Sequence, residues 1–153
     1  MIVVSDTSPI TALLTVGQAV ILSQLFGEVI IPQAVETELL RSHPILPDWL
    51  RVRRSSDAAK ADRYAQSVDR GEAEAIALAE ELHADHLLID ERKGRRLAQQ
   101  QGVPVVGLLG VVLMAKRAGL IPSARILLTR LDQEAGVYWT DDLREAALKT
   151  VGE

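Results

Sequence analysis

Residues 70–96 read RGEAEAIALAEELHADHLLIDERKGRR, and this stretch decides the predicted fold because it contains one helix that leads into one strand. We expect Gly71 to be the N-cap of the helix, which keeps an apolar period until His83 and Ala84. Residues 86–89 then form a short apolar run that ends at Asp90. Such a run, with helices before and after it, is typical of a strand buried on both faces of a parallel sheet.

The same stretch predicts where two acidic residues meet. In a parallel sheet, a helix begins at the carboxyl edge of the sheet and the strand that follows it returns to that edge. Glu72, at the start of the helix, and Asp90, at the end of the strand, therefore belong to one edge. Open α/β sheets bind their ligands at that edge.

Strands alternate with helices along the rest of the chain. The strands are expected at residues 2–4, 29–31, 49–53, 86–89 and 103–106. The helices are expected at residues 10–26 with a break near Gly17, 32–41, 56–68, 72–83, 91–101, 108–118, 122–131 and 143–149, with Ser8, Ser56 and Thr140 among their caps. This alternation predicts the α/β class, with a central parallel sheet of four to five strands flanked by helices on both faces.

Composition limits the class of protein. The 153 residues are 48% hydrophobic and 25% charged, which suits a single domain over residues 1–153, with a longer helical tail from about residue 122. The chain has no cysteine, which excludes disulfides and thiolate metal sites. The net charge of −4 means that nucleic-acid binding requires a local basic patch. Only two Trp, two Tyr and one Phe are present, which argues against stacking of bases on a sheet.

No segment predicts a membrane span or a secretion signal. The longest apolar run, residues 103–115, is interrupted by glycines and falls well short of the roughly 20 residues that cross a bilayer. No charged leader precedes an apolar signal segment. We therefore expect a cytoplasmic protein.

Four carboxylates are expected at the carboxyl edge of the sheet. Asp6 follows the first strand, Glu38 lies in the first two turns of the helix that begins at Pro32, and Glu72 and Asp90 join them. Taken alone, each acid reads as a helix cap or a surface charge. Two carboxylates about 4 Å apart repel by roughly 4 kcal/mol at an effective dielectric near 20, so the cluster needs a hard cation or shared protons. Oxygen ligands favour Mg²⁺ or Mn²⁺.

Other charged residues lie near these four. Glu36, Glu74 and Glu91 are possible substitute ligands, although Glu36 and Glu38 lie about 200° apart on a helix, so only one faces the site. A basic group follows Asp90 and consists of Arg92, Lys93, Arg95 and Arg96. It would place positive charge where a phosphodiester must lie, and the alternative is a solvated helix face.

Four segments resemble the motifs of the PIN-domain family, metal-dependent ribonucleases that include toxins of type II toxin–antitoxin pairs. The segments are VVSDTSPI (3–10), IPQAVETEL (31–39), RGEAEAIALAEELHADHLLIDER (70–92) and VVGLLGVVLMAKRAGLI (105–121). The resemblance implies a PIN-like three-layer fold, with Asp6, Glu38, Glu72 and Asp90 as catalytic metal ligands. It also implies a supporting hydroxyl at Thr7 or Ser8.

Three features depart from the family pattern. Glu72 stands where many members carry Asp, no threonine stands two residues before Asp90, and the tail is longer than a toxin needs. These departures leave two main hypotheses: a metal-dependent endoribonuclease acting on single-stranded RNA, or a non-catalytic PIN-like module that binds RNA or protein. A receiver-type phosphoacceptor domain using Asp6 or Asp90 is a weaker third.

Two partners besides RNA are expected. The toxin interpretation implies a small antitoxin protein, because a free ribonuclease would damage its own cell. A homodimer is expected because the second half of the chain has more apolar helix surface than one side of the sheet needs. The residues concerned are Val111, Leu113, Met114, Leu127, Leu128 and Leu131. The alternative is that these residues pack on the sheet.

Overall fold

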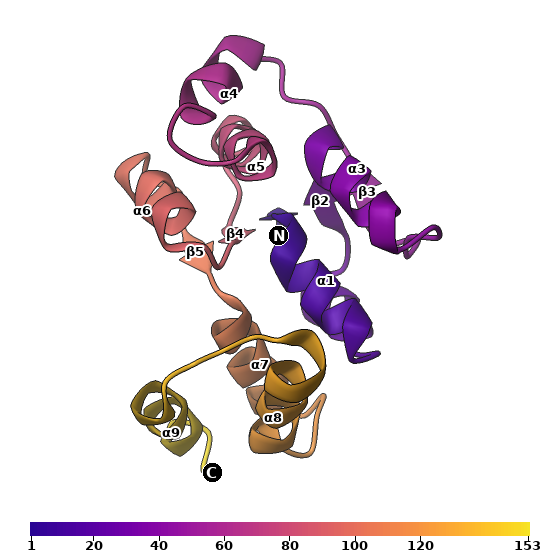
Figure 1. The fold of residues 1–153 in the computed structure, drawn as a ribbon, viewed down its shortest axis with the longest axis vertical. Helices are drawn as coiled ribbons and strands as arrows, with labels where there is room; N and C mark the ends of the chain where they lie inside the picture. Colours follow the sequence, from indigo (N-terminus) through magenta and orange to yellow (C-terminus); the bar gives the residue numbers. More distant parts are fainter.

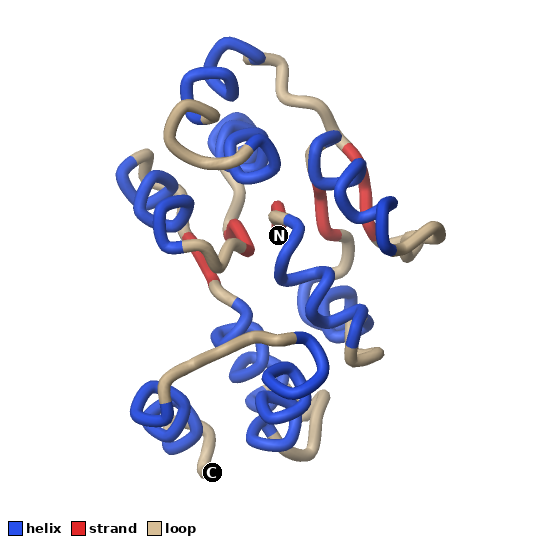
Figure 2. Tube along the Cα trace, viewed as in Figure 1, coloured by secondary structure: helices blue, strands red, loops and turns tan.

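The computed structural model describes residues 1–153. It shows a five-stranded parallel sheet with nine helices around it (Figures 1 and 2). The strands are β1 (Val3–Ser5), β2 (Val29–Ile31), β3 (Leu50–Val52), β4 (His86–Leu88) and β5 (Val105–Val106). The helices are α1 (Thr7–Thr15), α2 (Val20–Phe26), α3 (Gln33–Ser42), α4 (Ala58–Tyr64), α5 (Arg70–Leu82), α6 (Arg92–Gln100), α7 (Leu108–Arg117), α8 (Ala124–Ala135) and α9 (Asp141–Lys149). The predicted α/β class with a parallel sheet is confirmed.

The order of the strands creates a switch point between β1 and β4. The sheet reads β3-β2-β1-β4-β5, so the chain fills one side from β1 outward and then returns to fill the other from β4. Ser5 pairs with Leu88, and the Asp6 amide donates to the Leu88 carbonyl at 2.9 Å. Two neighbouring strands therefore end together, and the helices that follow them diverge. A crevice at such a point is where α/β sheets bind ligands.

Side chains alternate along the strands, so the two faces of the sheet pack into two separate hydrophobic cores. Val3 and Leu88 point into the larger cluster, which also contains buried residues of α1, α2, α3, α7 and α8. Val4 and Leu87 point into the smaller cluster, which is closed by α5 and α6. This period of two follows from the pleat of each strand, and it gives the fold its three layers. In Figure 1, α4 and α5 lie at one end of the long axis and α8 and α9 at the other.

Helix α5 begins earlier than the sequence indicated. Its N-cap is Asp69, whose carboxylate accepts a hydrogen bond from the Glu72 amide at 2.8 Å, so the prediction of Gly71 as the cap is wrong. A carboxylate satisfies a free N–H of the first turn, which glycine cannot do. The helix ends at His83, which adopts a left-handed conformation with φ of 50°.

Two other caps also differ from the prediction. Helix α1 is preceded by Asp6 rather than Ser8, and α4 is capped by Asp57 rather than Ser56. In each case an aspartate within two residues of the expected serine holds the cap position. The predicted break near Gly17 is confirmed, since Gly17 has a φ of 70° between α1 and α2.

The last third of the chain packs into the larger core. Val111, Leu127, Leu128 and Leu131 are buried there, and Leu113 and Met114 are partly buried against it, as the alternative to self-association expected. These side chains therefore supply no excess apolar surface for a dimer. We propose that the whole chain is one domain, because α8 shares its core with β1. No helix has the length and apolar character needed to cross a membrane.

Glu153, which follows α9, is hydrogen-bonded to the start of α8. Its carboxylate accepts hydrogen bonds from the Ala124 amide at 2.6 Å, the Ser123 hydroxyl at 2.8 Å and the Arg125 amide at 3.2 Å. Lys116 lies 3.6 Å away. The backbone N–H of Ala124 and these other groups lower the pKa of Glu153 to about 2.

We expect Glu153→Gln to lower the melting temperature at neutral pH. The pKa of Glu153 falls from 4.5 to about 2 on folding, so its contribution is present above pH 4.5 and is lost as the pH falls toward 2. The difference in melting temperature between wild type and variant should shrink over that range, measured by circular dichroism. Glu134→Gln is the control, because its pair with Arg130 is exposed and should matter little. Equal effects of the two substitutions would contradict the assignment.

Candidate functional site

An acidic pocket of about 460 Å³ lies at the carboxyl edge of the sheet. Carboxylates from four parts of the chain line it: Asp6, Glu38, Asp69, Glu72 and Glu91. Hydroxyl groups of Thr7, Ser8, Thr11 and Thr15 line it as well. Three of the four predicted acids, Asp6, Glu38 and Glu72, thus share one pocket, together with both predicted hydroxyl residues.

Asp6 and Glu38 meet beside Gly71, in the first turn of α5. A Cβ atom at position 71 would lie 2.7 Å from Glu38 Oε1 and 3.4 Å from Asp6 Oδ1. Glycine at this position therefore leaves space for the two carboxylates. Asp6 is only 6% exposed, because β1 ends inside the layers of the fold.

Glu72 approaches from α5 and reaches toward α6. Its Oε2 atom is fully buried without a hydrogen-bond partner, and it lies close to the Cα of Gly94, where any side chain would collide with it. The Oγ1 atom of Thr7 is also buried without a partner. Two polar atoms in one pocket thus lack the hydrogen bonds that buried groups normally make.

Burial and mutual repulsion raise the pKa values of these acids. Burial raises the pKa of Asp6 to about 7, and the charges of Asp69, Glu38 and Asp90 contribute to the rise. Burial likewise raises the pKa of Glu72 to about 8, with further contributions from Asp69 and Asp6. Such shifts are typical of functional sites, where like charges are held together in a low dielectric.

Asp90 lies apart from the other three predicted acids. Its Oδ1 accepts a hydrogen bond from the Leu108 amide at 2.8 Å, at the start of α7. Burial raises the pKa of Asp90, whereas the positive charge of Arg95 lowers it. Asp90 is near enough to contribute to the pKa of Asp6, but it lines a different cavity.

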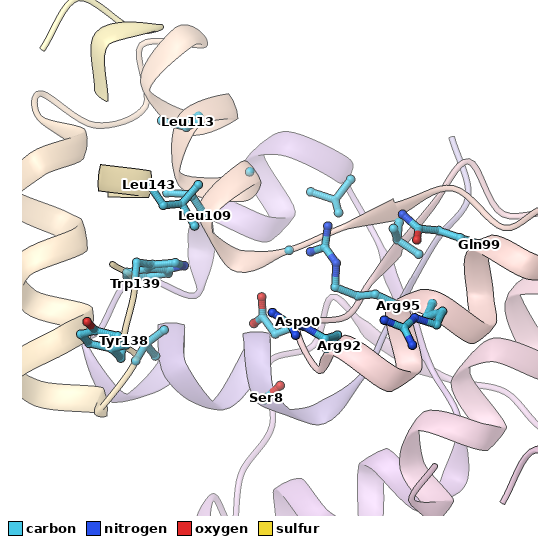
Figure 3. Close-up of a pocket in the computed structure, with 16 residues that line it drawn as sticks. Ser8, Asp90, Arg92, Arg95, Gln99, Leu109, Leu113, Tyr138, Trp139 and Leu143 are labelled. Atoms are coloured by element: carbon cyan, nitrogen blue, oxygen red, sulfur yellow. The ribbon is translucent and has the colours of Figure 1, made fainter. Parts of the chain in front are cut away.

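This second cavity is a groove of about 1030 Å³ between α6, α7 and the segment before α9 (Figure 3). Its polar lining includes Asp90, Ser8, Arg92, Arg95 and Arg96, and its apolar lining includes Leu109, Leu113, Tyr138, Trp139 and Leu143. Ser8 and Val137 line both cavities, so groove and pocket adjoin. Lys93, predicted with the three arginines, is exposed and does not line the groove.

The alternative acids have distinct positions. Glu36 does not line the pocket, so Glu38 is the acid of α3 that faces it. Glu74 accepts hydrogen bonds from the Ala34 amide and from Arg70, which ties α5 to the start of α3. Glu91 is the N-cap of α6 and also lines the pocket.

The sequence prediction missed Asp69 as a member of the pocket. Its signal was present, because Asp69 and Glu72 have the spacing of an N-cap and an acid three residues later. The nearby Gly71 was a competing candidate for the cap. The same carboxylate therefore caps α5 and adds negative charge beside Asp6 and Glu72.

A family comparison agrees with this architecture. The family model DUF3368, described as a PIN domain, matches residues 2–153. The chain belongs to the PIN-domain family. PIN domains are typically nucleases and generally bind a divalent metal ion. The search of curated proteins found no match to the chain.

The pocket of this PIN domain fits a divalent metal in its chemistry. Its donors are carboxylate and hydroxyl oxygens, which hard cations prefer, and it contains the unpartnered Glu72 Oε2 and Thr7 Oγ1. The raised pKa values of Asp6 and Glu72 show the electrostatic cost of the cluster without a cation. No three acidic or histidine side chains converge on one metal position as they stand.

We expect Glu72→Gln to raise the melting temperature at alkaline pH in EDTA. The pKa of Glu72 rises from 4.5 to about 8 on folding, so stability is lost as pH rises from 4.5 through 8. The amide carries no charge and avoids this loss. Differential scanning calorimetry should show variant and wild type converging near pH 4.5 and separating by pH 8.5. Glu36→Gln, which changes an acid of α3 outside the pocket, serves as the control, and a constant difference across this range would contradict the prediction.

Proposed function

We propose that this PIN-domain protein is a metal-dependent endoribonuclease that cleaves single-stranded RNA. The observation that carries the proposal is the pocket in which the buried Asp6 and Glu72 meet Glu38, with Asp6 after β1, Glu38 on α3 and Glu72 on α5. The adjoining groove places three arginines beside Asp90, where an RNA backbone could pass. Carboxylate and arginine side chains thus lie next to each other at the switch point of the sheet.

Asp6, Glu38 and Glu72 would hold Mg²⁺ or Mn²⁺, with Asp90 as the fourth acid at the rim. When bound, such an ion supplies Lewis-acid stabilisation of the charge that develops on the phosphate and lowers the pKa of water. Asp6 and Glu72 must release their protons to bind a cation, so affinity should rise with pH. Thr7 and Ser8 supply hydroxyls at the pocket wall.

The arginines of α6 would bind the phosphates of the substrate. Arg92, Arg95 and Arg96 form no salt bridge within the chain. Arg95 donates a hydrogen bond to the Ile89 carbonyl at 3.5 Å, so the guanidinium groups of Arg92 and Arg96 are the ones free for a ligand. Guanidinium donors match phosphate oxygens in geometry and charge. Phosphate contacts position a strand without reading its sequence, which suits a nuclease of broad specificity.

Asp6→Asn and Glu38→Gln should each reduce RNA cleavage by roughly 100-fold or more. Each removes a negative charge that would hold the cation, and the cation contributes several kcal/mol to the transition state. The measurement is cleavage of a labelled single-stranded RNA with Mn²⁺ or Mg²⁺, resolved on a denaturing gel.

Glu36→Gln is the matched control, because it changes the same helix as Glu38→Gln but lies outside the pocket. Its cleavage rate should equal that of wild type. Wild-type protein that cuts no RNA with either metal ion would exclude the nuclease assignment. Full activity in Asp6→Asn would exclude the proposed metal ligands.

Arg92→Ala and Arg96→Ala should weaken RNA binding and reduce its salt dependence. Each lost phosphate contact lowers the slope of log K against log[salt] by roughly 0.7 for a single strand. Fluorescence anisotropy over a salt series in EDTA measures the slope without cleavage. Lys93→Ala is the control, since Lys93 is on the same helix but outside the groove. An equal change in slope for Lys93→Ala would show that the whole helix face, rather than the groove, attracts RNA.

A non-catalytic binding module is the second candidate function. The absence of any three convergent ligands favours it, as does Glu72, whose carboxylate reaches toward Gly94. Such a module would retain RNA affinity in Asp6→Asn while yielding no product over long incubation with Mn²⁺. Product formation by wild type separates the two functions.

The toxin interpretation adds a proposed protein partner. A small antitoxin would cover the acidic pocket or the basic groove, and a short neighbouring reading frame that suppresses growth inhibition would support it. We also propose a homodimer. The apolar residues of α7 and α8 do not support it, because they pack within the chain. Light scattering at micromolar concentration tests it.

A further inference from the structure

The groove beside Asp90 contains two adjacent aromatic residues that the proposed ribonuclease mechanism does not use. Tyr138 is 76% exposed, and Trp139 is partly buried against the larger core. Both line the groove together with the arginines of α6. In Figure 3 the two rings lie on one side of Asp90, and Arg92 and Arg95 lie on the other. These two residues make up two of the five aromatics of the chain.

The backbone that carries these rings is fixed at both ends. The Val137 amide donates to the Leu131 carbonyl at 3.1 Å, just after α8 ends at Gly136. On the other side, the Thr140 hydroxyl accepts from the Leu143 amide at 3.2 Å and caps α9. The exposed Tyr138 ring therefore projects from a well-anchored segment, so little ordering is needed when it binds a ligand.

Three arginines and one aspartate line the groove, which gives it an excess of positive charge. None of Arg92, Arg95 and Arg96 forms a salt bridge. Arg95 donates to the Ile89 carbonyl at 3.5 Å, and the guanidinium groups of Arg92 and Arg96 have no hydrogen-bond partner in the chain. Unpaired guanidinium groups attract phosphates, and open aromatic faces stack on bases. One ligand that offers both is an unpaired strand of nucleic acid.

We propose that Tyr138 and Trp139 form a stacking platform for the bases of single-stranded RNA whose phosphates lie along α6. The proposal rests on the ribonuclease function and adds the feature that selects unpaired substrate. Because the groove and the acidic pocket share Ser8 and Val137, a strand held on the platform continues toward Asp6. Bases in a duplex are already stacked on each other and cannot use the platform.

Tyr138 provides the cleanest test, because its exposed ring can be removed without opening the core. Tyr138→Ala should weaken binding of a labelled single-stranded RNA in EDTA by about 5-fold to 100-fold, the loss of one stacked base. Tyr138→Phe keeps the ring and should bind like wild type. Ile45→Ala removes another highly exposed apolar side chain, outside the groove, and should have no effect.

The same RNA with abasic nucleotides distinguishes stacking from other contacts. Wild type should bind abasic RNA more weakly, and Tyr138→Ala should then cause no further loss. Trp49→Phe leaves Trp139 as the single tryptophan, whose fluorescence should be quenched by base-containing RNA and not by abasic RNA. Thermal melts of each variant confirm that the fold is intact.

Several results would overturn the platform. Normal RNA binding by Tyr138→Ala, together with weakened binding by Arg96→Ala, would remove the platform and leave the nuclease function standing. An equal effect of Tyr138→Ala on normal and abasic RNA would also exclude stacking. Quenching of Trp139 by an acidic peptide such as polyglutamate, and not by RNA, would identify a protein segment as the occupant. A protein that neither binds nor cleaves RNA would remove both the platform and the proposed function.

Discussion

The pairing of β1 with β4 is the constraint on which the rest of the structure depends. Ser5 pairs with Leu88, and the Asp6 amide donates a hydrogen bond to the Leu88 carbonyl. The pairing of the two strands therefore continues as far as Asp6, the residue after β1. Strands β2 and β3 then fill one side of the sheet and β5 the other. The two central strands end at the only place where consecutive connections diverge, and both Asp6 and Asp90 follow those ends.

This geometry conflicts with the electrostatics of the residues it brings together. Burial alone disfavours the charge of Asp6, and nearby carboxylates disfavour it further, which is why its pKa rises to about 7. Glu72 meets the same conditions from α5, and Asp69 raises the pKa values of both acids. Apolar side chains at this edge would avoid the free-energy cost of burying charged groups close together. The presence of several acids there, despite their mutual repulsion, is the physical reason to regard the pocket as a functional site rather than as part of the core.

The sequence predicted the sheet more accurately than the orientation of side chains at its edge. Residues 29–31 form β2 with the expected bounds, because β-branched residues between Gly27 and Pro32 leave little choice. Asp90 was expected in one cluster with Asp6, and its charge does act on Asp6, but its carboxylate accepts a hydrogen bond from the Leu108 amide and lines the adjoining groove. That partner lies 18 residues further along the chain, so no local pattern could identify it. Tyr138 lies in a connection without periodicity, and only packing of α9 reveals its neighbours.

Asp90 marks the boundary between two regions of opposite charge. On one side Asp6, Glu38 and Glu72 line the acidic pocket, and on the other the arginines of α6 line the groove. The net charge of −4 hides this division, because a phosphodiester responds to the field within about a Debye length rather than to the whole molecule. In the proposed function, a strand attracted by the arginines would meet the acids only where a cation offsets their charge. The approach of a phosphate to the pocket would therefore depend on a bound cation.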